Sequence, residues 1–302
     1  MDRINLISIE NYKIIKNKIE IDSFDPIIIF GSNGSGKTTI VESIQYFLNI
    51  CLYDYFAIII DNKNKDIIIN EKPTNFAIHF TYSNQDYFYE IQVFANHIGF
   101  EQLTNETNNQ IIFERSTKEI RSLMRTHPLC EYLKTIQIFN SDNNFSIADI
   151  NKYYSELEVI FKCLGISLNQ KLLSEIYKNE QYSKLKKIIQ LYITLKDALS
   201  NHNFLIIDDF DLGLDTNLIK SFISMFKSNN NQLMFTSGNT SLLDEKLFMK
   251  HQVYLLENIN NEMDLFTLNE FIDLPNGISF EKWYLTGRFG ALPLFNLEDL
   301  SK

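Results

Sequence analysis

The chain has 302 residues, of which 45% are hydrophobic and 22% are charged, with 28 Lys and Arg against 38 Asp and Glu. This composition can bury a sizeable core and excludes a disordered or collagen-like chain, and the length allows one large domain or two smaller ones. The net charge of −10 argues against a broadly basic nucleic-acid-binding surface, although a local basic groove is compatible with it.

The cysteines and the apolar runs indicate a cytoplasmic protein with no membrane partner. Cys51, Cys130 and Cys163 are odd in number and widely spaced, so neither a disulfide framework nor a zinc cluster is predicted. No export signal opens the chain, and its apolar runs are far shorter than a membrane helix, which needs about 20 residues.

The first predicted element with a chemical signature is a strand followed by a glycine loop. Ile27–Phe30 is apolar and rich in β-branched residues, as in a buried parallel strand. Gly31–Thr38 then matches the phosphate-binding pattern G-x-x-x-x-G-K-[ST] completely. Apolar residues at helical spacing follow, so strand, loop and helix stand in the order that phosphate binding needs.

This loop predicts binding of ATP and Mg²⁺. Its backbone N–H groups and the following helix N-terminus favour a phosphate. Lys37 is expected to reach the β- and γ-phosphates and to act in catalysis, and the Thr38 hydroxyl to bind Mg²⁺. The expected nucleotide contacts are Asn33, Gly34, Ser35, Gly36, Lys37, Thr38 and Thr39.

A compact helical insert is predicted over residues 116–200. Ser146–Asp149 is typical of a capping box and opens a helix that ends before Gly165. Further helices are predicted over Leu172–Lys178 and Ser183–Leu199. No heptad pattern is sustained, which excludes a long coiled coil, and we expect this insert to contact a partner or a second subunit.

The second half of a nucleotide site is predicted where the apolar strand Phe204–Ile207 ends. Asp208 is expected to hold Mg²⁺, and Asp209 to orient or deprotonate the attacking water. An apolar strand that ends in an acidic turn is common by itself, so the pairing with the glycine loop is what favours a functional interpretation. Asp215, before a predicted helix over Thr216–Lys227, faces a partner subunit or lies in an ordinary polar turn.

The motifs resemble those of a known group of ATPases. The loop form G-x-N-G-S-G-K-T-T resembles that of ABC, SMC and RecF proteins, and Ile7–Lys13 with Ile19–Ile21 looks like the first strands of such a head. Gln252–Glu257 and Trp283–Pro293 resemble the tail of small OLD-like ATPases of the abortive-infection (AAA-15-like) group, which includes the ATPase subunit of the PARIS anti-phage system. Phe80–Arg115 is similar to their antiparallel lobe.

The resemblance implies an α/β fold: a P-loop NTPase with an ABC-type ATPase head, a mixed core sheet, an antiparallel lobe and a short helical insert. It divides one discontinuous ATPase domain into an N-terminal half, 1–115, the insert, 116–200, and a C-terminal half, 201–302. The strands expected in the mixed sheet are Ile27–Phe30, Phe204–Ile207, Leu233–Phe235 and Val253–Leu256.

The resemblance also implies a role. It predicts a regulatory ATPase of a bacterial anti-phage defence system that sandwiches ATP between two heads, as a dimer or higher homo-oligomer. Such a protein controls a separate toxic effector, a nuclease such as a Toprim protein. The alternatives are a RecF/SMC-like DNA-repair ATPase that binds DNA in its ATP state, which the acidic balance disfavours, and a nucleotide-binding scaffold without useful turnover.

Departures from the family pattern predict slow hydrolysis. The Ser-Gly-rich signature loop is absent, and Ser183 either replaces it across a dimer or caps a helix. Asp209 stands where the family has Glu, and Gly238 where it has His, and a misplaced catalytic base costs orders of magnitude in rate.

Several residues outside the two motifs have open interpretations. The resemblance places Tyr12 or Lys13 beside the adenine. Arg288 is interpreted as a carboxylate anchor or an arginine finger. A cluster of three lysines is expected either to contact phosphates or to form a solvated helix face: Lys184, Lys186 and Lys187.

Overall fold

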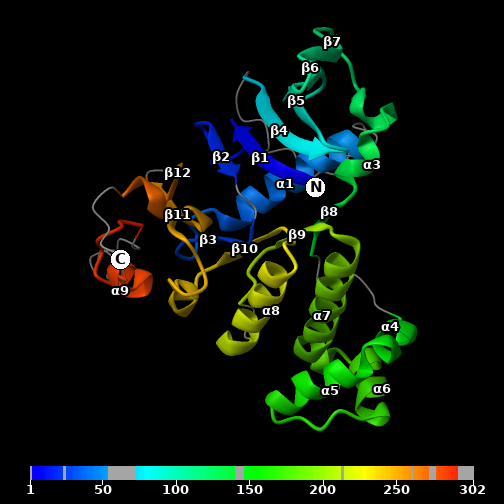
Figure 1. Ribbon diagram of the computed structural model, residues 1–302, viewed down its shortest axis with the longest axis vertical. Coiled ribbons are helices and arrows are strands. Elements are labelled where there is room, and N and C mark those ends of the chain that lie inside the picture. Colours follow the sequence, from blue (N-terminus) through cyan, green and yellow to red (C-terminus); the bar gives the residue numbers. More distant parts are fainter. Residues whose placement is uncertain are drawn as a thin grey trace, which may run out of the picture.

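The computed structural model describes residues 2–22, 25–53, 72–139, 146–211, 214–259, 261–271 and 277–291 (Figure 1). Within these ranges, one of two six-stranded sheets is antiparallel throughout, with the strand order β2-β1-β4-β5-β6-β7. Its strands are β1 (Arg3–Glu10), β2 (Ile19–Asp22), β4 (Thr74–Tyr82), β5 (Gln85–Val93), β6 (Ile98–Asn105) and β7 (Gln110–Arg115).

The second sheet is mixed, with the strand order β12-β11-β3-β10-β9-β8. Its strands run parallel from β8 to β11, and β12 pairs antiparallel at the edge. These strands are β3 (Ile27–Phe30), β8 (Ile136–Ile138), β9 (Phe204–Ile207), β10 (Leu233–Ser237), β11 (Val253–Ile259) and β12 (Glu262–Thr267). The predicted mixed core sheet, with all four expected strands, and the antiparallel lobe are confirmed.

Helices cover both sheets. The longer ones are α1 (Lys37–Leu52), α5 (Tyr154–Cys163), α6 (Gln170–Lys178), α7 (Ser183–Asn201) and α8 (Thr216–Ser228). The shorter ones are α3 (Cys130–Leu133), α4 (Ile147–Lys152) and α9 (Phe280–Leu285). Single 3-10 turns lie at Met124–Thr126, Glu180–Tyr182, Thr240–Leu242, Lys250–Gln252 and Leu268–Glu270. No helix in the described part of the chain is long and apolar enough to cross a membrane.

Two apolar cores hold these layers together. In the first, α1 packs against the buried face of the antiparallel sheet, where the rings of Phe47 and Phe76 lie 5.4 Å apart. In the second, α7, α8 and α9 pack on the mixed sheet. Figure 1 shows the antiparallel sheet at one end of the molecule and α4, α5 and α6 at the other, with the mixed sheet between them.

The region from 116 to 200 differs in part from the expectation. The Ser146–Asp149 capping box is confirmed, because each residue's backbone N–H donates to the other's side chain. The single helix predicted after it is two helices, α4 and α5, that meet at Tyr153. The region is not helical throughout, since β8 belongs to the core sheet beside β9. The division of the chain at 115 and 200 stays a prediction.

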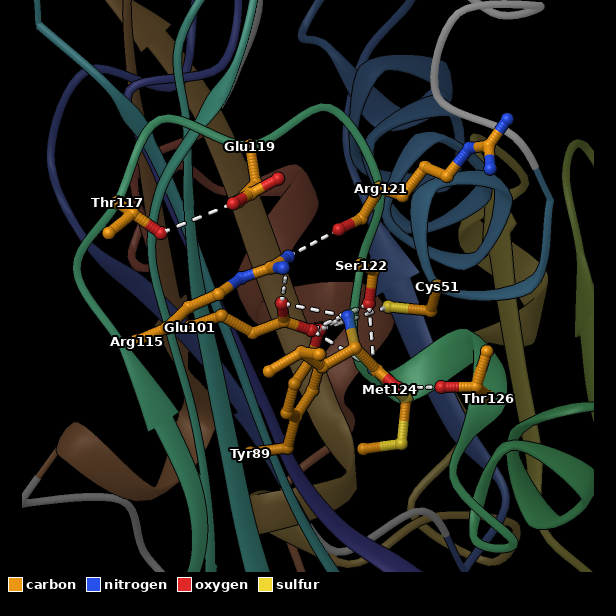
Figure 2. Close-up of polar contacts among 11 residues, drawn as sticks. Cys51, Tyr89, Glu101, Arg115, Thr117, Glu119, Arg121, Ser122, Met124 and Thr126 are labelled. Atoms are coloured by element: carbon orange, nitrogen blue, oxygen red, sulfur yellow. Dashed lines mark hydrogen bonds and ion pairs between the residues drawn. The ribbon is translucent and has the colours of Figure 1, made fainter.

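A buried carboxylate fixes the chain that follows β7 against the antiparallel sheet (Figure 2). Glu101, on β6, is 0% exposed, and its carboxylate pairs with Arg115 at 2.7 Å. It accepts four further hydrogen bonds, from the Tyr89 and Ser122 hydroxyls and the Leu123 and Met124 backbone N–H groups. A buried charge is tolerated when it is paired and hydrogen-bonded in this way.

Candidate nucleotide site

The carboxyl ends of β3, β10 and β9 lie side by side in the mixed sheet. Ser237 of β10 pairs with Phe30 of β3, and Phe235 of β10 pairs with Ile207 of β9. In open α/β sheets, ligands bind outside this end of the strands. The fold therefore brings the glycine loop and the acidic turn after β9 to one edge, although they are far apart in the sequence.

The glycines of the loop are required by its backbone and by its neighbours. Gly34 and Gly36 have φ values of 80° and 108°, which favour glycine. A Cβ on Gly36 would lie 2.3 Å from Met263 Cε and 2.7 Å from Ile14 Cδ1. The loop is thus pressed against the residues before β2 and on β12, and a side chain at Gly36 would displace it.

Lys37, at the start of α1, folds back over the loop. Its Nζ donates to the carbonyls of Gly31, at 2.8 Å, and Ser32, at 2.9 Å. Burial lowers the pKa of the Lys37 ammonium, and three carboxylates oppose this shift: Asp209, Asp211 and Asp208. The charges of the acidic turn therefore act on the lysine of the glycine loop.

The residues present fit a bound phosphate. The hydroxyl of Ser35 is buried and finds no hydrogen-bond partner among the described residues. The N-cap of helix α1 is Gly36, which has no side chain, so no capping side chain accepts the N–H groups of the first turn. A phosphate in the loop would accept hydrogen bonds from these groups.

Asp208 is held by the neighbouring strand. The Thr236 hydroxyl donates to Asp208 Oδ1 at 2.6 Å and accepts the backbone N–H of Asp209 at 2.8 Å. Thr38 is exposed on the first turn of α1. In the described residues no group of three or more His, Cys, Asp or Glu side chains is arranged to hold a metal ion. A Mg²⁺ ion would thus rely on Asp208, Thr38, water and phosphate oxygens, which suits its preference for few protein ligands.

Asp209 has an unusual backbone and an altered acidity. Its φ is +47°, a left-handed conformation that is uncommon outside glycine, and its side chain is exposed at the rim of the site. Desolvation by the surrounding protein raises the pKa of its carboxyl, Asp208 and Asp211 add to the rise, and Lys37 opposes it. A carboxylate with a raised pKa is a better general base than an ordinary one.

Gly238 closes the site from the end of β10. A Cβ at this position would lie 3.5 Å from the Gly31 carbonyl, 3.8 Å from Asn33 Oδ1 and 4.0 Å from Lys37 Nζ. The amide of the next residue, Asn239, donates to Thr216 at 3.2 Å. Gly238 therefore contributes no side chain beside Lys37.

A family model described as an AAA domain matches residues 6–203, more than half of the chain. The chain belongs to this AAA-domain family. No protein with a curated description matches its sequence.

The fold of this AAA-domain protein is similar to that of solved ABC-type ATPase heads. The crystal structure of the SmcHead bound to the C-winged helix domain of ScpA is 13% identical, with a TM-score of 0.50, over 92% of this chain and 99% of that chain. The SMC head domain from Thermotoga maritima is 13% identical, with a TM-score of 0.45, over 88% and 98% of the two chains. The recombination mediator RecF with ATP, from the RecFOR pathway, is 10% identical, with a TM-score of 0.47, over 88% and 99%.

Several other residues of this AAA-domain protein with open interpretations make local contacts. Tyr12 is 2% exposed and packs in the first core, so its ring is not available to stack on adenine. Lys13 pairs with Glu42 at 2.7 Å. Arg288 stacks on the Trp283 ring at 4.7 Å, and no described carboxylate lies within ion-pair distance of it, so it is not an anchor of that kind in this part of the chain.

Ser183 and Asp215 both lie at the start of a helix, but only Asp215 caps one. Ser183 is the first residue of α7, whose N-cap is Tyr182, so the capping interpretation of Ser183 is wrong. Asp215 caps α8 by accepting the backbone N–H groups of Asn217 and Leu218. Leu292 and Pro293 of the tail motif, and Leu212 and Gly213 before Asp215, lie outside the described residues.

Sequence reasoning missed two contributors to the site. The hydroxyl of Thr236 contacts Asp208 and the Asp209 backbone. Asp211 acts electrostatically on both Lys37 and Asp209. Its spacing, two residues after Asp209 in a turn that follows a buried strand, is the signal that would have identified it.

Proposed function

We propose that this AAA-domain protein is a Mg²⁺-dependent ATPase that binds ATP between the glycine loop and the acidic turn after β9. The observation that carries the proposal is the strand order β3-β10-β9, which places the glycine loop after β3 and the acidic turn after β9 at one edge of the mixed sheet. A lysine in a glycine loop, opposite a strand-end carboxylate, is the arrangement used by P-loop ATPases.

Each residue of the site has a role in this proposal. The loop N–H groups bind the phosphates, and Lys37 exchanges its two carbonyl acceptors for β- and γ-phosphate oxygens. Asp208 and Thr38 would hold Mg²⁺, which when bound neutralises charge on the phosphates. Asp209 orients the attacking water and accepts its proton.

We expect hydrolysis to be slow. Asp209 is one methylene shorter than glutamate, and Gly238 offers no side chain beside Lys37 to fix the γ-phosphate. A phosphate-release assay on the wild type, Lys37→Ala and Asp209→Ala tests this. Slow release by the wild type and its loss in both variants is expected, and rapid release that survives Asp209→Ala would overturn the proposal.

For the biological role, we infer a regulatory ATPase of a bacterial anti-phage defence system that sandwiches ATP between two copies and controls a separate effector, a nuclease such as a Toprim protein. The support is the resemblance of the tail, together with a contact inside it. Glu257 accepts the backbone N–H of Ala291 at 3.2 Å, and the Tyr284 hydroxyl donates to the Ala291 carbonyl at 2.8 Å.

The assembly is tested by native mass spectrometry with and without ATP, and the effector by copurification with the product of a neighbouring gene. A larger assembly in ATP and a copurifying nuclease are expected. A monomer under both conditions, with no copurifying protein, would contradict this role and leave the ATPase proposal intact.

The similarity of the fold to an SMC head supports a second candidate function, that of a DNA-binding ATPase of the RecF/SMC type. The net charge of −10 disfavours it. DNA binding that tightens with ATP and weakens steeply with salt would favour it over the first role.

A further inference from the structure

One face of the antiparallel sheet packs on α1, and the opposite face carries a row of carboxylates. Side chains that alternate with the buried ones pair across all six strands in the order Glu20, Ser8, Ala77, Glu90, Gln102 and Glu114. In a strand, alternate residues share one face, so the three glutamates of this row lie on the same side of the sheet.

Two adjoining hollows lie on this face, with volumes of about 320 Å³ and about 470 Å³. Both are lined by Leu6 and His79, and Ala77 and Phe88 add apolar surface to the first. We call this surface the acidic face; its lining carboxylates are Glu10, Glu20, Asp22, Asp86, Glu90 and Glu106.

Most of these carboxylates form no ion pair with a described residue. Among the described lining residues the basic side chains are Lys18, which pairs with Glu20 at 2.5 Å, and His79, whose Nδ1 lies 3.2 Å from Glu106. The other contacts come from neutral donors: Asn75 to Glu10, Thr81 to Asp86 and Tyr254 to Asp22, each at 2.7 Å.

Glu90 forms no ion pair with a described cation. Burial raises the pKa of the Glu90 carboxyl, Glu114 adds to the rise, and Lys18 opposes it. A ligand with positive charge would stabilise the ionised form of this carboxyl.

We propose that the acidic face binds a lysine- and arginine-rich segment of a protein partner. The aliphatic stems of such residues fit the apolar floor of Leu6, Ala77 and Phe88, while their cationic ends meet the carboxylates at the rim. The negative field repels nucleic acid from this face. None of its residues belongs to the nucleotide site, so the proposal is independent of the ATPase proposal.

The test uses the full chain and a fluorescein-labelled nona-arginine peptide, with binding followed by anisotropy at low and physiological salt. The variant Glu10→Gln/Glu90→Gln removes two carboxylates of the acidic face. Its matched control, Glu158→Gln/Glu245→Gln, makes the same charge change at exposed positions on α5 and before Lys246. We expect about tenfold weaker binding in the first and near wild-type binding in the control, given the strength of close charge pairs.

Equal weakening in both double variants would overturn the proposal, because the peptide would then respond to net charge alone. Displacement of the peptide by spermine at equal concentration would also overturn it, since a small polyamine would then suffice. Carbodiimide cross-linking of a lysine peptide to the wild type gives a second measurement that needs no variant. Cross-links on Glu10, Glu20 or Glu90 are expected, and cross-links confined to other surfaces would contradict the assignment.

Discussion

The hydroxyl of Thr236, on β10, donates a 2.6 Å hydrogen bond to the carboxylate of Asp208, at the end of β9. The same hydroxyl accepts the backbone N–H of Asp209, whose φ is +47°. One buried threonine thus orients the expected Mg²⁺ ligand and stabilises the turn that presents the expected catalytic base.

We predict that Thr236→Val raises the Mg²⁺ concentration that ATP hydrolysis requires. Valine has nearly the same shape but lacks the hydroxyl, and loss of a residue that orients a metal ligand costs about 10- to 100-fold in metal affinity. The measurement is the half-saturating Mg²⁺ concentration for phosphate release. Thr236→Ser retains the hydroxyl and should behave like the wild type, whereas an unchanged Mg²⁺ requirement in Thr236→Val would refute the role.

We predict that Asp209→Asn lowers hydrolysis by about 100-fold or more, which is the usual contribution of a general base. The same change should raise the free energy of unfolding at pH 7. Asparagine tolerates positive φ better than most residues, and the raised pKa of Asp209 means that its ionised form disfavours folding.

The sign of this second effect follows from proton binding. The folded chain holds the Asp209 proton more tightly than the unfolded chain, so stability falls as pH rises from the ordinary carboxyl value of 3.8 through the raised one. The stability difference between variant and wild type, measured by urea denaturation, should therefore be larger at pH 7 than near pH 3. A variant that is less stable than the wild type at pH 7 would show that Asp209 is favourably placed when ionised.

We predict that Glu101→Gln lowers the free energy of unfolding by about 3 kcal/mol, because removing one partner leaves Arg115 charged and poorly paired inside the lobe. The buried Nε of Arg115 already lacks a hydrogen-bond acceptor among the described residues. Urea denaturation measures the change. The control is Glu114→Gln, an exposed neighbour on the adjacent strand, for which we expect a change within about 0.5 kcal/mol.

Two substitutions at Asp215 distinguish its role as a helix cap from a contact with a partner subunit. Asp215→Ala removes the N-cap of α8 and should cost about 1 kcal/mol of stability, whereas Asp215→Asn keeps a capping oxygen and should cost little. If Asp215→Asn also hydrolyses ATP at the wild-type rate, capping accounts for the residue. A stable Asp215→Asn protein with impaired hydrolysis would instead support a contact with a partner subunit.

The nucleotide loop and the acidic turn were predictable because local chemistry dictates them. Gly34 and Gly36 adopt positive φ values, and the apolar strands that precede the loop and the acidic turn, β3 and β9, are buried throughout. The helices around Ser146 and Thr216 were predictable from their caps and apolar spacing.

What the sequence did not reveal depends on contacts between distant segments. β8 has only three residues, Ile136–Ile138, which is too short for a periodic pattern. The resemblance places Tyr12 or Lys13 beside the adenine, whereas Tyr46 and Phe76 pack against the Tyr12 ring. Leu103 indicates that Glu101 faces inward, because residues two apart on a strand share one face and both are buried. The partners of Glu101, however, come from three other segments, which the sequence does not bring together.

The central claim is that the edge of the mixed sheet beside Lys37 binds ATP. Its most direct test is calorimetric titration of Mg²⁺-ATP into the wild type and into Lys37→Met, with Lys171→Met, at an exposed position on α6, as the control. We expect about 10- to 100-fold weaker binding in Lys37→Met, the effect of a lost charge-assisted contact, and unchanged binding in the control. Wild-type affinity for ATP in Lys37→Met would contradict it.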